Sequence, residues 1–96
     1  KINWRKITAK QAHNLIRALS GPYPPAFCNY NGERYNILSS RLLDEKIMGL
    51  SGRIALRNKN GTVVIAKDKG LLITDISRQD GTKCSHKIFK LGDELE

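Results

Sequence analysis

One stretch of the sequence decides how this chain folds: it runs from His13 to Phe27 and reads His-Asn-Leu-Ile-Arg-Ala-Leu-Ser-Gly-Pro-Tyr-Pro-Pro-Ala-Phe. Its first half is the end of a helix, and Gly21 can adopt the left-handed conformation that closes one. Pro22 cannot continue the helix, and the three prolines stiffen the exit because each of them fixes φ. Tyr23 is therefore held between two prolines with little backbone freedom.

The helix before this corner has a well-marked start. Thr8 and Gln11 are spaced as a capping box, in which the Thr8 side chain accepts from the Gln11 amide and the Gln11 side chain reaches back. Apolar residues then recur with helical spacing at Ala12, Leu15, Ile16 and Leu19. The pattern predicts a helix from about Ala9 to Leu19 with one apolar face.

The rest of the chain consists of short apolar runs separated by turn signals, which is typical of a small β domain. Asn31-Gly32 predicts a type I′ hairpin turn, and Tyr35, Ile37 and Leu42 are expected to face inward. The expected strands are 27–30, 33–43, 53–57, 62–66 and 71–76. Loops are expected at 44–51 and 78–82, and the closing segment at 84–91 is expected to be either a strand or a short helix. We therefore predict a mainly β fold with one N-terminal helix, built as a small OB-like antiparallel barrel.

The length of the chain suits a single domain, which we assign to residues 1–94. Residues 95–96 are interpreted as a cloning scar and left out of the fold prediction. The sequence starts at Lys1 without a methionine or a leader, so we expect a piece of a longer protein. No apolar run approaches the roughly 20 residues that a membrane span needs, and no membrane partner is expected.

The chain is strongly basic, with 17 Lys and Arg, nine Asp and Glu, and a net charge of +8. Such an excess on a small domain favours a polyanionic partner such as RNA; a solubilising surface that a more acidic neighbouring domain balances is the alternative. Around two hairpin turns we predict a nucleic-acid-binding face that consists of Arg53, Arg57, Lys59, Lys67 and Lys69. Edge-strand cations that prevent association between sheets are the alternative explanation for this group.

The sequence contains no recognisable metal site or catalytic group. Cys28 and Cys84 lie far apart without a CxxC spacing, and we interpret them as two buried, reduced thiols. Together with His13 and His86 they do not make a full zinc set. His13 lies at the border of the apolar helix face, and the sequence places no partner beside it that would make it a general base.

Several motifs occur in the order in which the C-terminal domain of the formyltransferase family has them. They are Ile2-Asn3-Trp4, the Ser20-Gly21-Pro22-Tyr23-Pro24 corner, Asn31-Gly32-Glu33-Arg34, Ser51-Gly52-Arg53-Ile54, the run from Val64 to Ile73, and Gly81-Thr82-Lys83. The chain thus resembles this family, whose members include methionyl-tRNA and sugar-nucleotide formyltransferases. The family transfers a formyl group from 10-formyltetrahydrofolate to an amine, with the catalytic residues and the folate pocket in a separate N-terminal domain. The resemblance implies a cytoplasmic protein, of which this chain is a non-catalytic part that is inactive alone.

The resemblance leaves three functions open. The preferred one is a methionyl-tRNA formyltransferase-like domain that grips tRNA through a basic face, because the charge excess favours RNA. The first alternative is the same domain in an enzyme that acts on a nucleotide-linked amino sugar, since Pro25 replaces the family's usual glycine and the Tyr23 corner is more similar to those enzymes. The second is a stand-alone OB-type nucleic-acid-binding module. The resemblance further implies that Arg17 and Tyr23 contact substrate and that Trp4 seals the junction with the N-terminal domain rather than stacking on a ligand.

Overall fold

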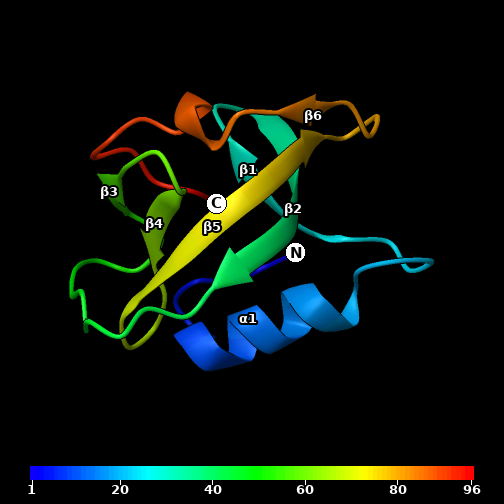
Figure 1. Cartoon of the computed structure of the whole chain (residues 1–96). Helices are drawn as coiled ribbons and strands as arrows, with labels where there is room; N and C mark the ends of the chain where they lie inside the picture. Colours follow the sequence, from blue (N-terminus) through cyan, green and yellow to red (C-terminus); the bar gives the residue numbers. More distant parts are fainter.

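A small antiparallel sheet with one helix makes up the molecule, and the computed structural model describes residues 1–96. The elements in chain order are α1 (Ala9–Ala18), β1 (Ala26–Tyr30), β2 (Glu33–Arg41), β3 (Ile54–Arg57), β4 (Thr62–Ile65), β5 (Gly70–Arg78), β6 (Lys83–Cys84) and the short 3₁₀ helix η1 (His86–Ile88). Figure 1 shows β5 crossing the middle of the molecule and α1 lying along one side, where it contacts β2 and β5. The predicted mainly β fold with one N-terminal helix is confirmed.

The start and the end of α1 follow the sequence signals. The Gln11 amide donates to Thr8 Oγ1 at 3.1 Å and the Thr8 amide donates to Gln11 Oε1 at 3.0 Å, so the capping box is complete. The helix ends at Ala18, one residue before the predicted end, with Leu19 as its C-cap. Gly21 has φ +92°, which only glycine adopts without strain, and the chain leaves the helix there.

The sheet has the strand order β1-β2-β5-β4-β3, and β6 pairs with the far end of β5. Every pair of neighbouring strands is antiparallel. Asn31 and Gly32 join β1 to β2 with φ of 51° and 77°, the two positive values that a type I′ turn requires. The predicted hairpin is therefore confirmed, and it fixes the register of the first two strands.

The sheet is not closed into a barrel by its strands, because β1 and β3 remain edges that do not pair with each other. The last residues of the chain span this gap. Asn29 exchanges both backbone hydrogen bonds with Glu96, at 2.6 and 2.8 Å, while the amides of Ile54 and Leu95 donate to Asp93 O and Gly52 O, both at 2.8 Å. Leu95 is buried. Residues 95–96, which were left out of the fold prediction, are thus part of the structure.

The main core lies between α1 and the inner face of the sheet. Ala12 and Ile16 of α1 pack into one apolar cluster with Ile37 of β2 and Ile73 of β5. Phe89 completes the core from the closing segment, with ring centroids 5.2 Å from Tyr30 and 5.8 Å from Tyr35 in edge-to-face geometry. This segment, predicted to be a strand or a short helix, contains a short piece of each, namely the end of β6 and η1.

One residue that was predicted to lie in the core does not lie there. Leu42 is exposed, whereas Tyr35 and Ile37 are buried as expected. The register of β2 against β5 shifts around Ser39, and such a bulge breaks the strict in–out alternation on which the prediction relied. Leu43 and Ile47, from the loop after β2, instead pack on a second small core of β4 and β5 residues.

The turn between β4 and β5 is attached to the start of α1 by one backbone hydrogen bond and one hydrogen bond to a side chain. The Lys67 amide donates to Ile7 O at 2.8 Å, and the Ala9 amide donates to Asp68 Oδ1 at 2.9 Å. The second contact satisfies one of the free amides in the first turn of the helix, although 59 positions separate the two residues. The hydrogen bond from Ala9 is the largest of the causes that lower the pKa of Asp68.

Because Asp68 caps α1 from a distant turn, Asp68→Ala is expected to lower the free energy of unfolding by about 1 kcal/mol at pH 7. The folded-state pKa of Asp68 is lowered, so the carboxylate stabilises the fold above its ordinary value of 3.8, and this contribution disappears as the pH falls through the folded-state pKa. Urea unfolding of both proteins between pH 7 and pH 3 measures the difference. Asp44→Ala, at an exposed position, is the matched control. An equal loss in both variants would contradict the capping role.

The two cysteines are both free thiols and lie in different surroundings. Cys28 of β1 faces the core and is fully buried, whereas Cys84 of β6 is only half-buried, so the expectation of two buried thiols is correct for Cys28 alone. The strands β2 and β5 lie between the two carriers in the sheet. Burial raises the pKa of the Cys28 thiol to about 12 and also raises that of Cys84.

At pH 8, a thiol-alkylating reagent is therefore expected to modify Cys84 while Cys28 stays unmodified until the protein is unfolded. The thiolate is the reactive form, and Cys28 has neither solvent access nor a pKa that would allow it to ionise. Mass spectrometry of the native protein should find one adduct per chain, and Cys84→Ser should remove it. Equal rates for both thiols would show that β1 opens readily.

Candidate nucleic-acid interface

The five cations predicted to form one face are divided between two ends of the β3–β4–β5 meander. Arg57 and Lys59 belong to the end of β3 and the turn that follows it, whereas Lys67 and Lys69 belong to the turn between β4 and β5. These turns lie at opposite ends of β4, a strand that is roughly 13 Å long. Arg53 stands at the start of β3, where its carbonyl accepts from the Ile65 amide at 3.0 Å.

Two of these five side chains already have protein partners. Arg53 forms an ion pair with Glu94 at 3.3 Å, in which both side chains are about half exposed. The Arg57 guanidinium donates to Lys87 O at 2.6 Å and to Phe89 O at 3.2 Å, and so holds the closing segment against β3. Lys59, Lys67 and Lys69 take part in none of the side-chain hydrogen bonds or ion pairs of the structure, which leaves their charges available to a partner.

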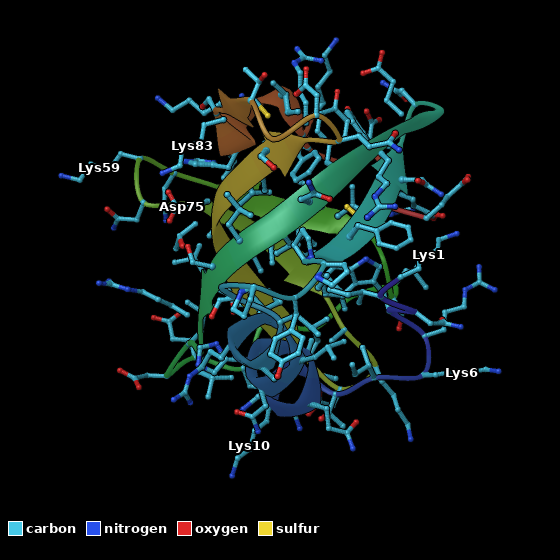
Figure 2. The ribbon with its side chains drawn as sticks, turned by 90° about the vertical axis from the view of Figure 1, so that its right-hand side faces the viewer. Lys1, Lys6, Lys10, Lys59, Asp75 and Lys83 are labelled. Atoms are coloured by element: carbon cyan, nitrogen blue, oxygen red, sulfur yellow. The ribbon has the colours of Figure 1, made fainter.

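The contacts that tie the β4–β5 turn to the start of α1 bring a different group of cations together. We call this group the helix-start cluster, and it consists of Arg5, Lys6, Lys10, Lys67 and Lys69. Figure 2 shows Lys6 and Lys10 extending away from the body of the molecule. Asp68 lies between Lys67 and Lys69, but its carboxylate is engaged by the Ala9 amide. The cluster therefore consists of five cations carried by two backbone segments that are hydrogen-bonded to each other.

Arg5, Lys6 and Lys10 were not among the predicted site residues. The neighbouring residues in the sequence do not mark them as a binding site, because cations near the start of an amphipathic helix are common on solvent-exposed surfaces. The signal lies in the pairing of residues 7–9 with residues 67–68, which joins segments about 60 positions apart. The spacing of charges along the chain does not contain this information.

Arg17 lines an open groove between α1 and β2, together with His13, Ser20, Ser39 and Ser40 among others. His13 Nδ1 lies 2.8 Å from Ser40 Oγ, a partner that the sequence did not indicate. Ser39 in turn contacts Thr74 and Asp75, and its hydrogen bond is the first cause that lowers the pKa of the Asp75 carboxyl. Arg17 itself is exposed and takes part in no side-chain ion pair.

Tyr23 is 61% exposed and stands on the proline corner beyond the helix. It is not among the residues that line the Arg17 groove, so the structure does not join the two predicted substrate-binding residues in one pocket. The exposed ring is free to meet a flat partner.

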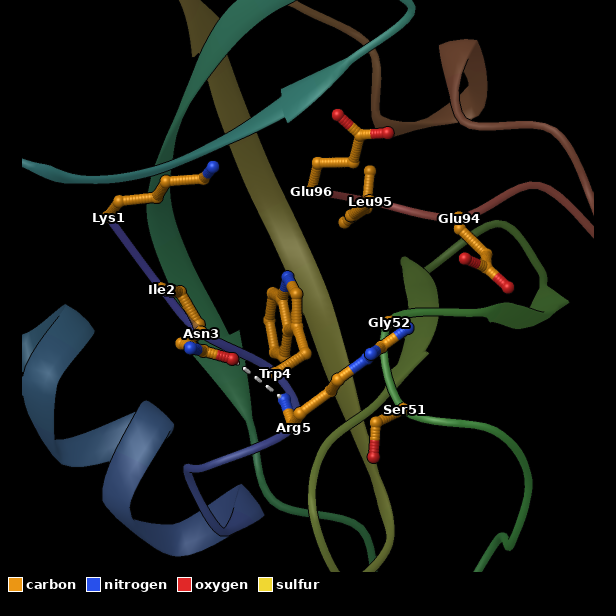
Figure 3. Close-up of a pocket in the computed structure, with 10 residues that line it drawn as sticks. All are labelled: Lys1, Ile2, Asn3, Trp4, Arg5, Ser51, Gly52, Glu94, Leu95 and Glu96. Carbon is orange, nitrogen blue, oxygen red and sulfur yellow. Dashed lines mark hydrogen bonds between the residues drawn. The ribbon is translucent and has the colours of Figure 1, made fainter.

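Trp4 is 3% exposed and belongs to the main core, which excludes a role as a stacking platform. It also lines a cavity of about 470 Å³ between the first and last residues of the chain. Figure 3 shows this cavity, with Trp4 at its centre and Gly52 and Leu95 at its edge.

Two further findings concern membrane-spanning helices and groups of metal-binding side chains. No helix is long and apolar enough to cross a membrane. No three His, Cys, Asp or Glu side chains come together as a group that could hold a metal ion. The free cations, the polar groove and the cavity beside Trp4 are the features that a partner could use.

Comparison with known proteins identifies the family of this chain. Residues 1–93 match the family described as formyl transferase, C-terminal domain. The methionyl-tRNA formyltransferase of Clostridium beijerinckii is 35% identical over 99% of this chain, and that of Mycoplasma mycoides is 40% identical over 82%. The aligned part makes up 30% and 25% of these relatives, so the chain spans less than a third of their length. The chain therefore belongs to the formyl transferase C-terminal domain family.

Proposed function

We propose that this chain is the substrate-binding C-terminal domain of a methionyl-tRNA formyltransferase and that it grips tRNA through the helix-start cluster. The observation that carries the proposal is the similarity to relatives of that name over almost the whole chain. Formyl transfer itself, from 10-formyltetrahydrofolate to the amino group, belongs to an N-terminal catalytic domain, and no residue of this chain is assigned to it. The chain alone is expected to be inactive, and the whole protein is expected to work in the cytoplasm.

The helix-start cluster is suited to the sugar–phosphate backbone of RNA. Its five cations include four exposed ones, and none of them forms an ion pair within the chain. Phosphate contacts position an RNA without depending on its sequence, which suits a domain that recognises the shape of a folded RNA. Two hydrogen bonds join the two segments, one between backbone groups and one to the Asp68 carboxylate. The main chain that carries these cations is therefore already ordered before a partner binds.

Arg17 and Tyr23 are proposed as additional contacts. Arg17 lines the polar groove between α1 and β2, where a guanidinium can bind a phosphate through two parallel hydrogen bonds. Tyr23 has an exposed ring held by neighbouring prolines, and with tRNA it is proposed to make a minor contact of less than about 1 kcal/mol, because a full stack on a base is expected only with a sugar nucleotide. Both contacts are proposed to add to the binding free energy that the helix-start cluster contributes.

The alternatives receive less support. A nucleotide-linked amino sugar as substrate is favoured only by the exposed Tyr23 and its proline corner, whereas the relatives carry the name of the tRNA enzyme. A stand-alone OB-type module is less well supported, because the relatives are more than three times as long as the part aligned with this chain.

A comparison of two triple variants tests the location of the RNA contact. Replacing Lys10, Lys67 and Lys69 by Gln is expected to weaken binding of an initiator tRNA and to flatten the dependence of log K on log salt. Each lost contact to a duplex phosphate reduces the slope by about 0.9, so the change should approach about 2 to 3. Replacing Lys59, Lys83 and Lys87 by Gln removes the same charge elsewhere and should change the slope less. The slopes are measured by fluorescence anisotropy between 50 and 200 mM salt.

Circular dichroism of both triple variants shows whether the fold is intact. A larger effect from the second variant would place the contact at the β3–β4 end instead. No binding of tRNA by the folded wild-type chain at low salt would defeat the RNA-binding proposal.

Tyr23→Ala separates the two substrate classes. If the substrate is tRNA, most of the binding energy comes from the cluster, and the variant should bind tRNA within about threefold of the wild type, which is less than 1 kcal/mol. If the substrate is a sugar nucleotide, stacking on its base contributes roughly 1–3 kcal/mol, and binding should fall roughly ten- to hundredfold. Titration of the whole protein, wild type and variant, with tRNA and with a pyrimidine nucleotide sugar measures both. A large effect on the sugar nucleotide alone would favour the alternative.

A further inference from the structure

The outward face of the β1–β2 hairpin carries two side chains that stack on each other. The Cζ atom of Arg34 lies 3.7 Å from the centroid of the Phe27 ring, which is a close cation–π contact. The two residues are diagonal neighbours, because Phe27 is paired with Asn36 and Arg34 with Asn29. Both side chains are half-buried, while Cys28 between the outward positions of β1 faces the core. The ring therefore holds the guanidinium in one place on the outside of the sheet.

The three guanidinium nitrogens of Arg34 have different surroundings. Nε is buried and has no hydrogen-bond partner. Nη1 and Nη2 form no hydrogen bond or ion pair within the chain either, but unlike Nε they are reached by solvent. A partner can therefore approach the guanidinium only end-on, through its two Nη groups. Two parallel donors of this kind match two oxygens of one anion, as in the bidentate contacts of arginine with phosphate.

No carboxylate of the chain forms an ion pair with Arg34. Glu33, its neighbour in β2, is directed to the opposite face, where it pairs with Arg78 at 3.5 Å and accepts from the Tyr35 hydroxyl at 3.0 Å. Glu96 pairs with the outer edge of β1 through its backbone and makes no ion pair. The positive charge of Arg34 thus stays available to an anion from outside the chain.

A row of polar side chains crosses the same face of the sheet, from Asn36 of β2 through Ser77 of β5 to Lys83 of β6. The Asn36 amide donates to Ser77 Oγ at 3.1 Å, and both residues are buried. Lys83 is exposed and interacts with the Asp75 carboxylate, and Figure 2 shows these two residues on the same side of the molecule. Arg34 therefore differs from Lys83, because no acid balances its charge.

We propose that the Nη1 and Nη2 groups of Arg34 bind a backbone phosphate of RNA and that Phe27 positions them for this contact. The proposal rests on the proposed function, in which the chain holds tRNA. A phosphate is favoured over a carboxylate because the net charge of the chain is +8, which attracts a polyanion. Since stacking on Phe27 already restricts the Arg34 side chain, binding removes less side-chain entropy than it does for a freely rotating lysine.

The Arg34 contact is separate from the helix-start cluster. Arg34 lies at the hairpin end of β2, whereas Arg41, at the other end, pairs with Leu72 near the turn that carries Lys67 and Lys69. Seven residues of extended strand span roughly 24 Å between the two ends. Figure 1 shows α1 beside the second of these ends. Arg34 and the cluster are therefore expected to bind different phosphates of one RNA, with contributions that add.

Two substitutions of Arg34 separate its charge from its geometry. Binding of an initiator tRNA to the 96-residue chain is followed by fluorescence anisotropy between about 50 and 200 mM salt. Arg34→Gln is expected to weaken binding about tenfold and to reduce the slope of log K against log salt by about 0.7 to 0.9. Arg34→Lys keeps the charge but not the paired donors, so binding should fall about threefold while the slope is unchanged.

Phe27→Leu tests the positioning role, because leucine keeps an apolar side chain and removes the aromatic face. This change should weaken tRNA binding about threefold in the wild-type chain and should have no effect in the Arg34→Gln background. A merely structural role would weaken binding equally in both backgrounds, and that result would exclude Phe27 from the contact.

Arg78→Gln is the matched control, since Arg78 lies at the same end of the sheet but is engaged by Glu33, and it should change binding by less than about twofold. Circular dichroism checks the fold of every variant. Equal losses in Arg34→Gln and Arg78→Gln, or full affinity of Arg34→Lys, would overturn the proposal, because charge alone would explain the binding.

The same titrations distinguish this site from the proposed function as a whole. Wild-type affinity of Arg34→Gln for tRNA would remove the Arg34 site and leave the helix-start cluster as the RNA contact. No binding of tRNA by the wild-type chain would remove both. If Arg34→Gln instead weakens binding of a pyrimidine nucleotide sugar and leaves tRNA binding unchanged, the phosphate is that of a small nucleotide, and the assignment to RNA is wrong.

Discussion

The attachment of the β4–β5 turn to the start of α1 is the contact on which the proposed RNA-binding surface depends. Two hydrogen bonds, from Lys67 to Ile7 and from Ala9 to Asp68, hold together two segments that carry five cations between them. Without this contact, Lys67 and Lys69 would belong to a hairpin turn and Lys6 and Lys10 to a separate helix end. The carboxylate that caps the helix is the one acidic group between Lys67 and Lys69, and it also interacts with Lys69. One tertiary contact thus stabilises the helix and concentrates the positive charge.

The surface has two regions of different chemical character. The helix-start cluster is cationic and exposed, and it fits a phosphate backbone. The cavity beside Trp4 is lined by charges of both signs, with Lys1 and Arg5 from the first residues of the chain and Glu94 and Glu96 from the last ones. The two features adjoin each other. The Ser51 hydroxyl donates to Ala66 O at 3.2 Å, so the turn at 51–52 lies beside the turn at 67–69, and Arg5 belongs to the cluster and also lines the cavity.

The terminal segment has a larger role than its length suggests. Residues 93–96 satisfy backbone groups on both edges of the sheet, and Leu95 fills the core between them. Exposed edge strands are sites for association with other chains, and this one segment covers part of both edges. The same segment forms a wall of the cavity beside Trp4, so the shape of that cavity depends on the completion of the sheet.

Local signals in the sequence were sufficient for the elements of this fold. The Thr8–Gln11 capping box, Gly21 and Asn31-Gly32 each depend on neighbouring residues only, and all three appear in the structure as predicted. The resemblance carried by Ile2-Asn3-Trp4 and the proline corner also led to the correct family. The prediction that Leu42 faces the core was wrong because the register of β2 against β5 shifts at a bulge, which changes the alternation of inward and outward side chains. The role of residues 95–96 was missed because their partners, Asn29 and Gly52, are more than 40 positions away.

What the sequence determined by itself was therefore the set of local conformations, the overall excess of positive charge and the family. The tertiary structure alone decided which cations lie together, since Arg53 and Arg57 became structural while Lys6 and Lys10 joined Lys67 and Lys69. It also decided that Trp4 is a buried core residue and not an exposed ring. The physical reason is the same in each case: a turn or a cap is specified by neighbours in the chain, whereas a surface is specified by segments that meet only when the sheet has formed.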